Sequence, residues 1–247
     1  MVKKINFLNI SIDAITMQET LQKVENTILL KKQIHHTVVN AGKVVLMQTD
    51  KELEESVIEA DLINADGQAI VWAANLLGNK LPERVSGIDL MEELVKRSFK
   101  KGYKCFFFGA TEEVVTKLVN IYKMQYSEDI IAGYRNGYFV KKDEEEIALQ
   151  IAESGADILF VAITSPKKEV FLNTYKNQLL NVNFIMGVGG SFDVIAGKVK
   201  RAPLWMQNIG LEWFYRVLQE PKRMWKRYLV GNTKFICLVL KEYFNSK

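Results

Sequence analysis

Short apolar runs alternate with segments of helical periodicity along most of this 247-residue chain. Five runs rich in β-branched or aromatic residues predict strands, at residues 34–40, 62–65, 104–108, 157–163 and 183–188. The central runs are apolar without interruption, as expected for strands that are covered on both faces. Strand–helix alternation of this kind predicts an α/β fold with a Rossmann-like, mostly parallel sheet and helices on both of its faces.

Helix boundaries can be read at several points. Thr16 with Glu19 forms a capping-box pattern, and Thr49 with Glu52 forms a second one. Asp89 is expected to open a helix that ends at Gly102, with a strand directly after it.

The charge is concentrated near the C-terminus. Residues 198–247 carry eleven Lys and Arg against three acids, and they hold three of the four tryptophans. Pro203 and Pro221 each stand where a helix could begin, and apolar residues follow with near-helical spacing. We therefore expect an α/β domain over residues 1–197 and a basic, aromatic-rich helical appendage over residues 198–247. Such an appendage needs an anionic partner, which could be lipid headgroups, nucleic acid or a phosphate-bearing ligand.

Membrane insertion and secretion are not expected. The apolar stretch 235–240 is too short to span a bilayer, and residues 1–13 lack the continuous apolar core of a signal peptide. Two cysteines do not suggest a disulfide framework. The expected location is the cytoplasm.

Polar clusters follow the predicted strands, at the sheet edge where parallel sheets bind ligands. They occupy residues 36–42, 64–68, 108–111, 164–169 and 187–193. The glycine-rich turn at 187–190 suits a phosphate, but it also suits a plain tight turn. Asp66 could be a functional carboxylate or an ordinary helix N-cap. His35 and His36 are expected to lie within a strand, without a chemical role.

Several chemistries lack their sequence signals. The chain has no Asp-x-Asp, no Cys/His cluster, no P-loop and no Gly-x-Ser-x-Gly, which argues against a metal site, a P-loop nucleotidase and a serine hydrolase. What remains is an acid, Asp66, with arginines that include Arg84 and Arg201. A base with cations fits displacement of a nucleoside diphosphate by a hydroxyl, without a metal or cofactor.

The motifs at residues 66–73, 84–90, 165–169, 187–193 and 201–207 resemble those of the WecG/TagA/CpsF glycosyltransferases. Gly-Leu-Glu-Trp at 210–213, Arg216 and residues 220–223 extend the likeness over nearly the whole chain, in the right order.

The resemblance implies a metal-independent, inverting transfer by a catalytic domain with a membrane-binding C-terminal appendage. It implies N-acetylmannosamine, or a related sugar, moving from a UDP donor to N-acetylglucosamine on undecaprenyl diphosphate. The product would serve wall teichoic acid or another cell-surface polymer. The implied partners are the UDP-sugar, the lipid-linked acceptor and the inner face of the cell membrane, where the protein is expected to associate peripherally. No nucleic acid is expected, and a homo-oligomer is allowed.

The same resemblance implies residue roles. Asp66 matches the general base, Arg84 lies beside the pocket, and Asp193 matches the nucleotide end. Arginines of the C-terminal segment would meet a diphosphate. The expected catalytic set is Asp66, Arg84, Asn40 and Lys168, and the expected substrate-binding set is Thr37, Gly109, Thr111, Gly189, Gly190, Asp193, Arg216, Arg223 and Arg227.

Two departures from the family pattern bear on the sugar. The chain has Val38-Val39-Asn40 where the family usually reads Thr-x-Asn, and Thr37 is displaced by one residue, onto the opposite face of the strand. It also has Lys168 where the family usually reads Gln, which motivates an alternative donor, UDP-glucose or a UDP-uronate in exopolysaccharide synthesis. A non-enzymatic nucleic-acid-binding module is the alternative from another class; the near-helical spacing of aromatics among aliphatics favours an interface helix instead.

Overall fold

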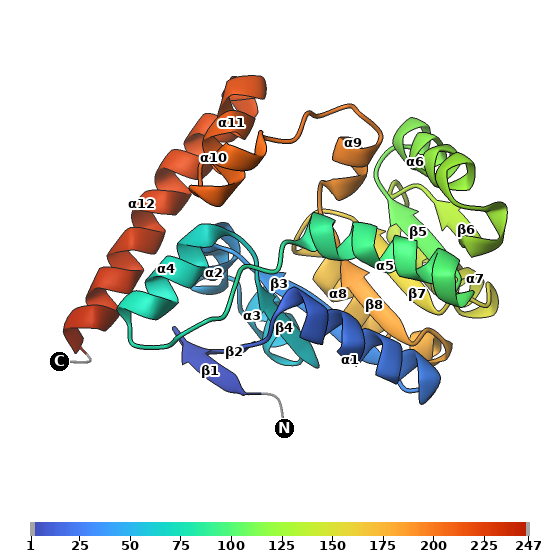
Figure 1. The fold of residues 1–247 in the computed structure, drawn as a ribbon, viewed down its shortest axis with the longest axis horizontal. Helices are drawn as coiled ribbons and strands as arrows, with labels where there is room; N and C mark the ends of the chain where they lie inside the picture. Colours follow the sequence, from blue (N-terminus) through green and yellow to red (C-terminus); the bar gives the residue numbers. More distant parts are fainter. Residues whose placement is uncertain (1–2, 246–247) are drawn as a thin grey trace.

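A computed structural model describes residues 3–245, except for the side chains of Arg223 and Arg227. Its centre is a six-stranded sheet in the order β4-β3-β8-β7-β5-β6, and every neighbouring pair is parallel. The strands are β3 (Ile34–Val39), β4 (Leu62–Ala65), β5 (Cys105–Gly109), β6 (Ile131–Arg135), β7 (Ile158–Ala162) and β8 (Phe184–Gly187). The five predicted strands are confirmed. The parallel sheet, flanked by helices, confirms the Rossmann-like α/β prediction (Figure 1).

Three strands were not predicted. β6 is a half-buried edge strand, so its sequence lacks the apolar run that marks the central strands. β1 (Lys4–Phe7) and β2 (Ile10–Asp13) form a separate antiparallel hairpin. Leu8 and Asn9 make its turn with positive φ angles of 49° and 65°.

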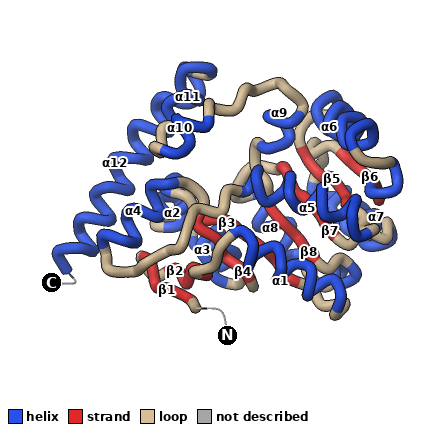
Figure 2. Tube along the Cα trace, viewed as in Figure 1, coloured by secondary structure: helices blue, strands red, loops and turns tan. Residues whose placement is uncertain are grey.

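Helices occupy most of the connections (Figure 2). In the body they are α1 (Met17–Leu29), α2 (Ala41–Met47), α3 (Lys51–Ile58), α4 (Gln68–Leu76), α5 (Gly87–Lys101), α6 (Glu112–Gln125), α7 (Glu144–Glu153), α8 (Lys167–Thr174) and α9 (Ser191–Ile195), with short 3-10 turns η1 (Glu128–Ile130), η2 (Lys141–Asp143) and η3 (Gln178–Asn181).

The capping predictions had mixed outcomes. Thr16 and Glu19 form the predicted capping box of α1, and Gly102 ends α5 with a φ of 76°. The prediction of a cap at Thr49 is wrong, because the carboxylate of Asp50 accepts the Leu53 N–H at 3.0 Å and caps α3 instead. Asp89 lies inside the first turn of α5, which begins at Gly87.

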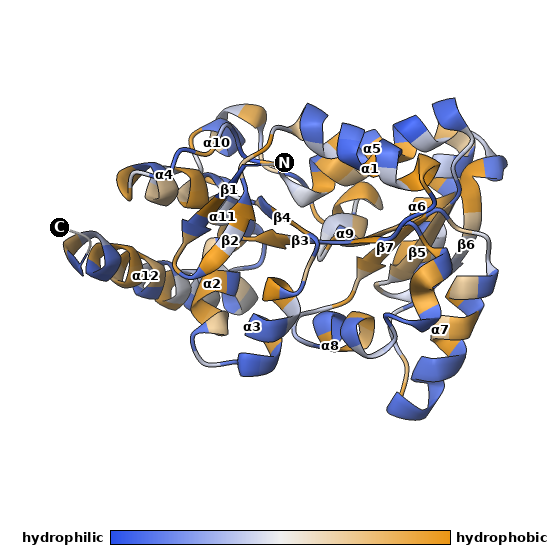
Figure 3. Ribbon diagram, turned by 90° about the horizontal axis from the view of Figure 1, so that it is seen from below, coloured by the Kyte–Doolittle hydropathy of each residue, from blue (hydrophilic) through white to orange (hydrophobic). Residues whose placement is uncertain are grey.

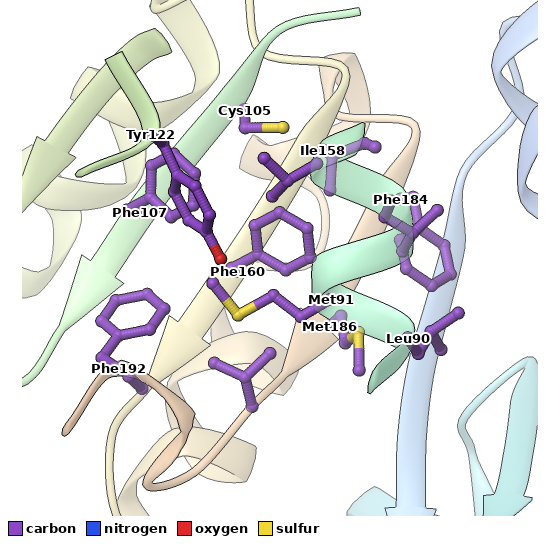
Figure 4. Close-up of a cluster of buried hydrophobic side chains, with 14 of the residues drawn as sticks. Leu90, Met91, Cys105, Phe107, Tyr122, Ile158, Phe160, Phe184, Met186 and Phe192 are labelled. Atoms are coloured by element: carbon purple, nitrogen blue, oxygen red, sulfur yellow. The ribbon is translucent and has the colours of Figure 1, made fainter. Parts of the chain in front are cut away.

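Alternate side chains of the central strands point to opposite faces, and each face has its own core. On one face, Phe107 and Phe160 pack with residues of α1, α5, α6 and α9 (Figure 4). On the other, Leu159 and Val161 pack with α7 and α8. At the β3–β4 end of that face, α2, α3, α4 and the β1–β2 hairpin enclose a third cluster. Fully buried aromatic and aliphatic side chains of this kind contribute about 1.5–3 kcal/mol each.

Three helices follow the body: α10 (Leu204–Asn208), α11 (Glu212–Gln219) and α12 (Pro221–Asn245). They lie together on the side of the molecule that carries α2 and α4 (Figure 1). α12 packs against α2 and buries Phe235 and Val239, and the Phe235 ring lies 6.3 Å from that of Phe7. The predicted C-terminal helical appendage is confirmed, and it shares a core with the body.

The remaining surface of these three helices is rich in exposed apolar side chains. Hydrophobic residues recur along α12 in Figure 3. They are Leu204, Trp205, Ile209, Trp213, Phe214, Leu218, Trp225, Leu229, Val230, Ile236, Leu240 and Phe244. Across residues 3–245, no helix combines the length and the apolarity that a membrane span requires.

The topology leaves a place for a ligand at the carboxyl ends of β3 and β8. β3 and β8 are neighbours, but α2 follows β3 onto one face of the sheet whereas α9 follows β8 onto the other. Connections that diverge in this way leave the carboxyl ends of the two strands open to a ligand.

Candidate active site

Asp66 stands directly after β4, at the carboxyl edge of the sheet. Its N–H donates to the Val39 carbonyl at 2.9 Å, which ties the ends of β3 and β4 together. The carboxylate does not cap α4: the N-cap is Gly67, with a φ of 96° and no side-chain cap. The alternative that Asp66 is an ordinary N-cap is therefore wrong.

The pKa of Asp66 is raised to about 6. Burial is the largest cause, followed by the negative charges of Glu212 and, more weakly, Asp89; the positive charges of Arg84 and Lys43 oppose the shift. A carboxyl group with a pKa near neutrality can accept a proton more readily than an ordinary aspartate, yet it remains mostly ionised at pH 7.

Arg84 is fixed beside Asp66 by the backbone and by two acids. Val85 donates its N–H to the Ala65 carbonyl at 2.9 Å, so the loop before α5 runs along the end of β4. The Arg84 guanidinium donates to Glu212 at 3.2 Å and lies 3.9 Å from Asp89. Arg84 thus connects the loop before α5 to the first residue of α11.

Arg201 extends this ion-pair network. Its two terminal nitrogens donate to both oxygens of Asp89, at 2.6 and 2.8 Å, and its Nε lies 4.0 Å from Glu212. Burial alone would raise the pKa of Asp89, but hydrogen bonds from Arg201 and its positive charge bring that pKa below its ordinary value. Asp89 therefore stays ionised at neutral pH, paired with Arg201.

A second polar cluster lies between α2 and α8. The Lys43 ammonium donates to the Thr37 hydroxyl at 3.0 Å and to Glu169 at 3.1 Å, and Lys168 pairs with the same Glu169 oxygen at 2.7 Å. The Ser165 hydroxyl donates to that oxygen at 2.9 Å. The two lysines, Thr37 and Glu169 are all at least nine-tenths buried, so this cluster is shielded from solvent.

The charges in the second cluster perturb one another. Burial would raise the pKa of Glu169, but Lys168 and Lys43 outweigh it and lower that pKa to about 2. Burial, with the like charge of Lys168, lowers the pKa of Lys43 to about 8. Asp66 also acts on Lys43, and this electrostatic coupling links the two clusters.

The glycine-rich turn after β8 receives a cation from the C-terminal helices. A Cβ atom at Gly190 would lie 3.0 Å from a guanidinium nitrogen of Arg216, so the absence of a side chain lets Arg216 of α11 approach the turn. Gly189 has a φ of 53°. Asp193, in α9, pairs with Lys198 at 3.3 Å. Arg216 and the glycine-rich turn therefore lie together.

Other predicted residues have visible structural roles. The Asn40 side chain accepts the Lys43 N–H at 3.0 Å and caps α2. Thr111 caps α6 by accepting from Val114 at 3.3 Å, and Gly109 packs so closely on Ala162 that a Cβ would clash with its backbone. Arg223 and Arg227 lie in α12, but their side chains are outside the described part of the structure.

Comparison with known proteins decides the family. The sequence model of the WecG/TagA/CpsF glycosyltransferase family matches residues 5–247. The chain belongs to this family.

Two relatives carry the same name, N-acetylglucosaminyldiphosphoundecaprenol N-acetyl-beta-D-mannosaminyltransferase. The one from Bacillus subtilis (strain 168) is 38% identical over 198 residues, which cover 80% of this chain and 75% of the relative. The one from Bacillus spizizenii (strain ATCC 23059 / NRRL B-14472 / W23) is 39% identical over 182 residues, 74% of this chain and 69% of the relative. As a WecG/TagA/CpsF protein with these relatives, the chain is a hexosyltransferase.

Several residues of this candidate site are not singled out by the sequence. Nothing in the sequence distinguishes Lys43 beyond its place three residues after Asn40, and Asp89 is predicted only to open a helix. Glu169 and Glu212 lie inside motifs of the resemblance, but neither had an assigned role. Asp89 and Glu212 pair with Arg84, and Glu169 pairs with Lys168. Lys43 donates to Thr37 and pairs with Glu169. Such contacts between distant segments have no local signature.

Among the residues that the structure describes, no group of three or more His, Cys, Asp or Glu side chains is arranged to hold a metal ion. Metal independence itself stays a prediction.

Proposed function

We propose that the protein transfers N-acetylmannosamine from a UDP donor to N-acetylglucosamine on undecaprenyl diphosphate, in a step of wall teichoic acid or related cell-surface polymer synthesis. The names of the two relatives support the sugar and the acceptor. The observation that carries the chemistry is Asp66, a partly buried carboxylate with a pKa of about 6 on which the positive charge of Arg84 acts.

The proposed reaction is a single displacement with inversion. Asp66 takes the proton of the acceptor hydroxyl as its oxygen attacks the anomeric carbon of the donor, and the bond from that carbon to the UDP oxygen breaks. Negative charge develops on the departing diphosphate, and guanidinium groups stabilise it without a metal. Arg84 acts electrostatically on Asp66 and shares Asp89 with Arg201, and Arg216 lies over the glycine-rich turn at Gly190.

The test is transfer itself. Purified protein is incubated with a panel of UDP-sugars and a short-chain lipid-linked N-acetylglucosamine acceptor, and the products are identified by mass spectrometry. The expected result is one N-acetylhexosamine added, with UDP-N-acetylmannosamine as the preferred donor and the new linkage inverted. Absence of transfer from every donor would refute the proposal.

The alternative donors, UDP-glucose and UDP-uronates, are tested by the same panel. Their motive is Lys168, whose ammonium is held 2.7 Å from Glu169 inside the buried cluster. This pairing satisfies the lysine charge within the protein, so a sugar carboxylate is not needed to explain it. We therefore keep the N-acetylhexosamine as the proposed donor sugar.

We further propose that residues 1–197 form the catalytic domain and that residues 198–247 bind the cytoplasmic face of the membrane and complete the site. The C-terminal segment joins a net positive charge to an exposed apolar surface that includes Trp225 and Leu229. Each basic residue near an anionic surface contributes ~1 kcal/mol, and inserted apolar side chains add to it.

Point substitutions test this membrane role better than deletion, because deletion would also remove Phe235 and Val239 from the core. Trp225→Glu and Leu229→Glu should reduce sedimentation with vesicles that contain anionic lipid. Leu149→Glu, an exposed position on α7, is the matched control. Equal sedimentation of all variants, or binding to RNA in place of vesicles, would contradict the membrane assignment.

A further inference from the structure

Glu212 is the first residue of α11, and it faces the body of the protein. One of its oxygens accepts from Arg84 at 3.2 Å, and the other lies 4.0 Å from the Nε of Arg201. The C-terminal helices therefore contribute an acid, as well as basic residues, to the candidate active site.

The network around Glu212 alternates in charge. Arg84 lies between Glu212 and Asp89, and Arg201 also lies between these two acids. The Arg84 and Arg201 side chains are only 16% and 22% exposed, so solvent screens their ion pairs incompletely. Removal of Glu212 would leave Arg84 with Asp89 alone, at 3.9 Å, as its remaining acid partner in this network.

Glu212 is held in place by a tight contact just before it. A Cβ atom at Gly210 would lie 3.0 Å from the Trp72 ring and 3.2 Å from the Gln68 Cβ, and the φ of Gly210 is 70°. Gln68 and Trp72 belong to α4, the helix that begins two residues after Asp66. The start of α11 is therefore seated on the same segment that carries the proposed base.

We propose that Glu212 is a positioning residue for the reaction: it holds Arg84 in place beside Asp66 and makes the charge around the base depend on α11 being seated. The inference deepens the proposed function and rests on it. After burial, Glu212 is the strongest influence on the pKa of Asp66, stronger than the opposing charge of Arg84. Asp89 and Lys43 are the other charged groups that act on this carboxyl.

The first experiment compares Glu212→Gln with wild type. Glutamine can still accept from Arg84, but it removes the negative charge, so the pKa of Asp66 should fall. Titration of the ¹³C-labelled Asp66 carboxyl by NMR reads this shift directly, and the acid limb of kcat/KM should move to lower pH with it. Loss of kcat by about 10- to 100-fold, with a smaller change in KM, is expected because the neutral glutamine holds Arg84 less firmly than a carboxylate and because Asp66 becomes a weaker base.

The matched control is Glu92→Gln, which removes a carboxylate 3.9 Å from the Arg201 guanidinium. It should leave both the Asp66 titration and the rate of sugar transfer unchanged. Glu212→Ala, which also removes the hydrogen bond, should lose more activity than Glu212→Gln. An Asp66 titration and an acid limb that coincide with wild type in Glu212→Gln would overturn the inference, even if the variant is less stable.

The two proposals fail separately. If wild-type protein transfers no sugar from any donor, the proposed function is wrong, and the NMR titration still shows whether Glu212 acts on Asp66. If wild type transfers sugar and Glu212→Gln keeps its rate and its titration, only the role of Glu212 is wrong.

Discussion

Asp66→Asn should make the protein more stable and inactive, and the gain in stability should depend on pH. The pKa of Asp66 is raised from 3.8 to about 6 in the folded protein, so folding favours the protonated carboxyl. Each pKa unit corresponds to about 1.4 kcal/mol, so ionised Asp66 costs the fold about 3 kcal/mol at neutral pH.

The sign of the pH dependence follows from the raised pKa. Below about pH 4 the carboxyl is protonated in both the folded and the unfolded chain, and the substitution should change stability little. As pH rises through 6, wild type loses this contribution and the asparagine variant does not. At pH 7.5 the variant should gain about 3 kcal/mol, or about 6 to 12 °C in Tm for a chain of this size.

Thermal unfolding of both proteins between pH 4 and 8 measures this difference, and turnover in the sugar-transfer assay should fall by about 10²–10⁴-fold. Asp50→Asn is the matched control, since Asp50 caps α3 and asparagine caps a helix about as well. A destabilised Asp66→Asn, or a gain in stability of the same size at pH 4 and 7.5, would refute the conclusion that ionised Asp66 destabilises the fold. Near-normal turnover would refute the catalytic role.

Three further predictions concern packing and charge. Phe235→Ala should cost about 3–5 kcal/mol in urea unfolding because it removes a buried ring beside Phe7; the exposed Phe244→Ala should change stability by less than about 0.5 kcal/mol. Gly187→Ala places a Cβ 2.4 Å from the Lys168 side chain, and overpacking should cost about 1–3 kcal/mol, measured in the same way; a neutral result would show that Lys168 can move freely. Transfer should continue in excess EDTA, because arginines neutralise the leaving group; activity that returns only with Mn²⁺ or Mg²⁺ would show a missed metal site.

The sequence predicted the central sheet well because buried parallel strands require continuous apolar runs. β5, β7 and β8 are buried along their whole length, and all three were found. β6 was missed because an edge strand buries only part of each side chain. The β1–β2 hairpin was missed because its turn, Leu8-Asn9, is not a recognised two-residue hairpin sequence.

The sequence singles out candidate residues of the site but not the pairings between them. Asp66 stands alone in sequence as an acid after a strand, and only the structure shows that Gly67 caps α4 in its place. Arg84 and Glu212 are 128 residues apart, and Lys43 and Glu169 are 126 apart. No periodicity or local motif connects such positions, since the contact exists only when the sheet and the C-terminal helices are packed.

The division of charges between the body and the C-terminal helices has a consequence for the proposed chemistry. The body supplies the proposed base, Asp66. The helix α11 supplies both Glu212, whose charge raises the pKa of Asp66, and Arg216, the cation over the glycine-rich turn. The same three C-terminal helices carry the exposed apolar surface proposed to meet the membrane. A lipid-linked acceptor stays in the bilayer. If membrane contact stabilises the packing of α11 against the body, the proposed base and the cations are brought together at the membrane surface, where the acceptor is. Under this arrangement, anionic vesicles should raise kcat in wild type. They should raise it less in Glu212→Gln, because α11 of this variant no longer carries the negative charge that acts on Asp66.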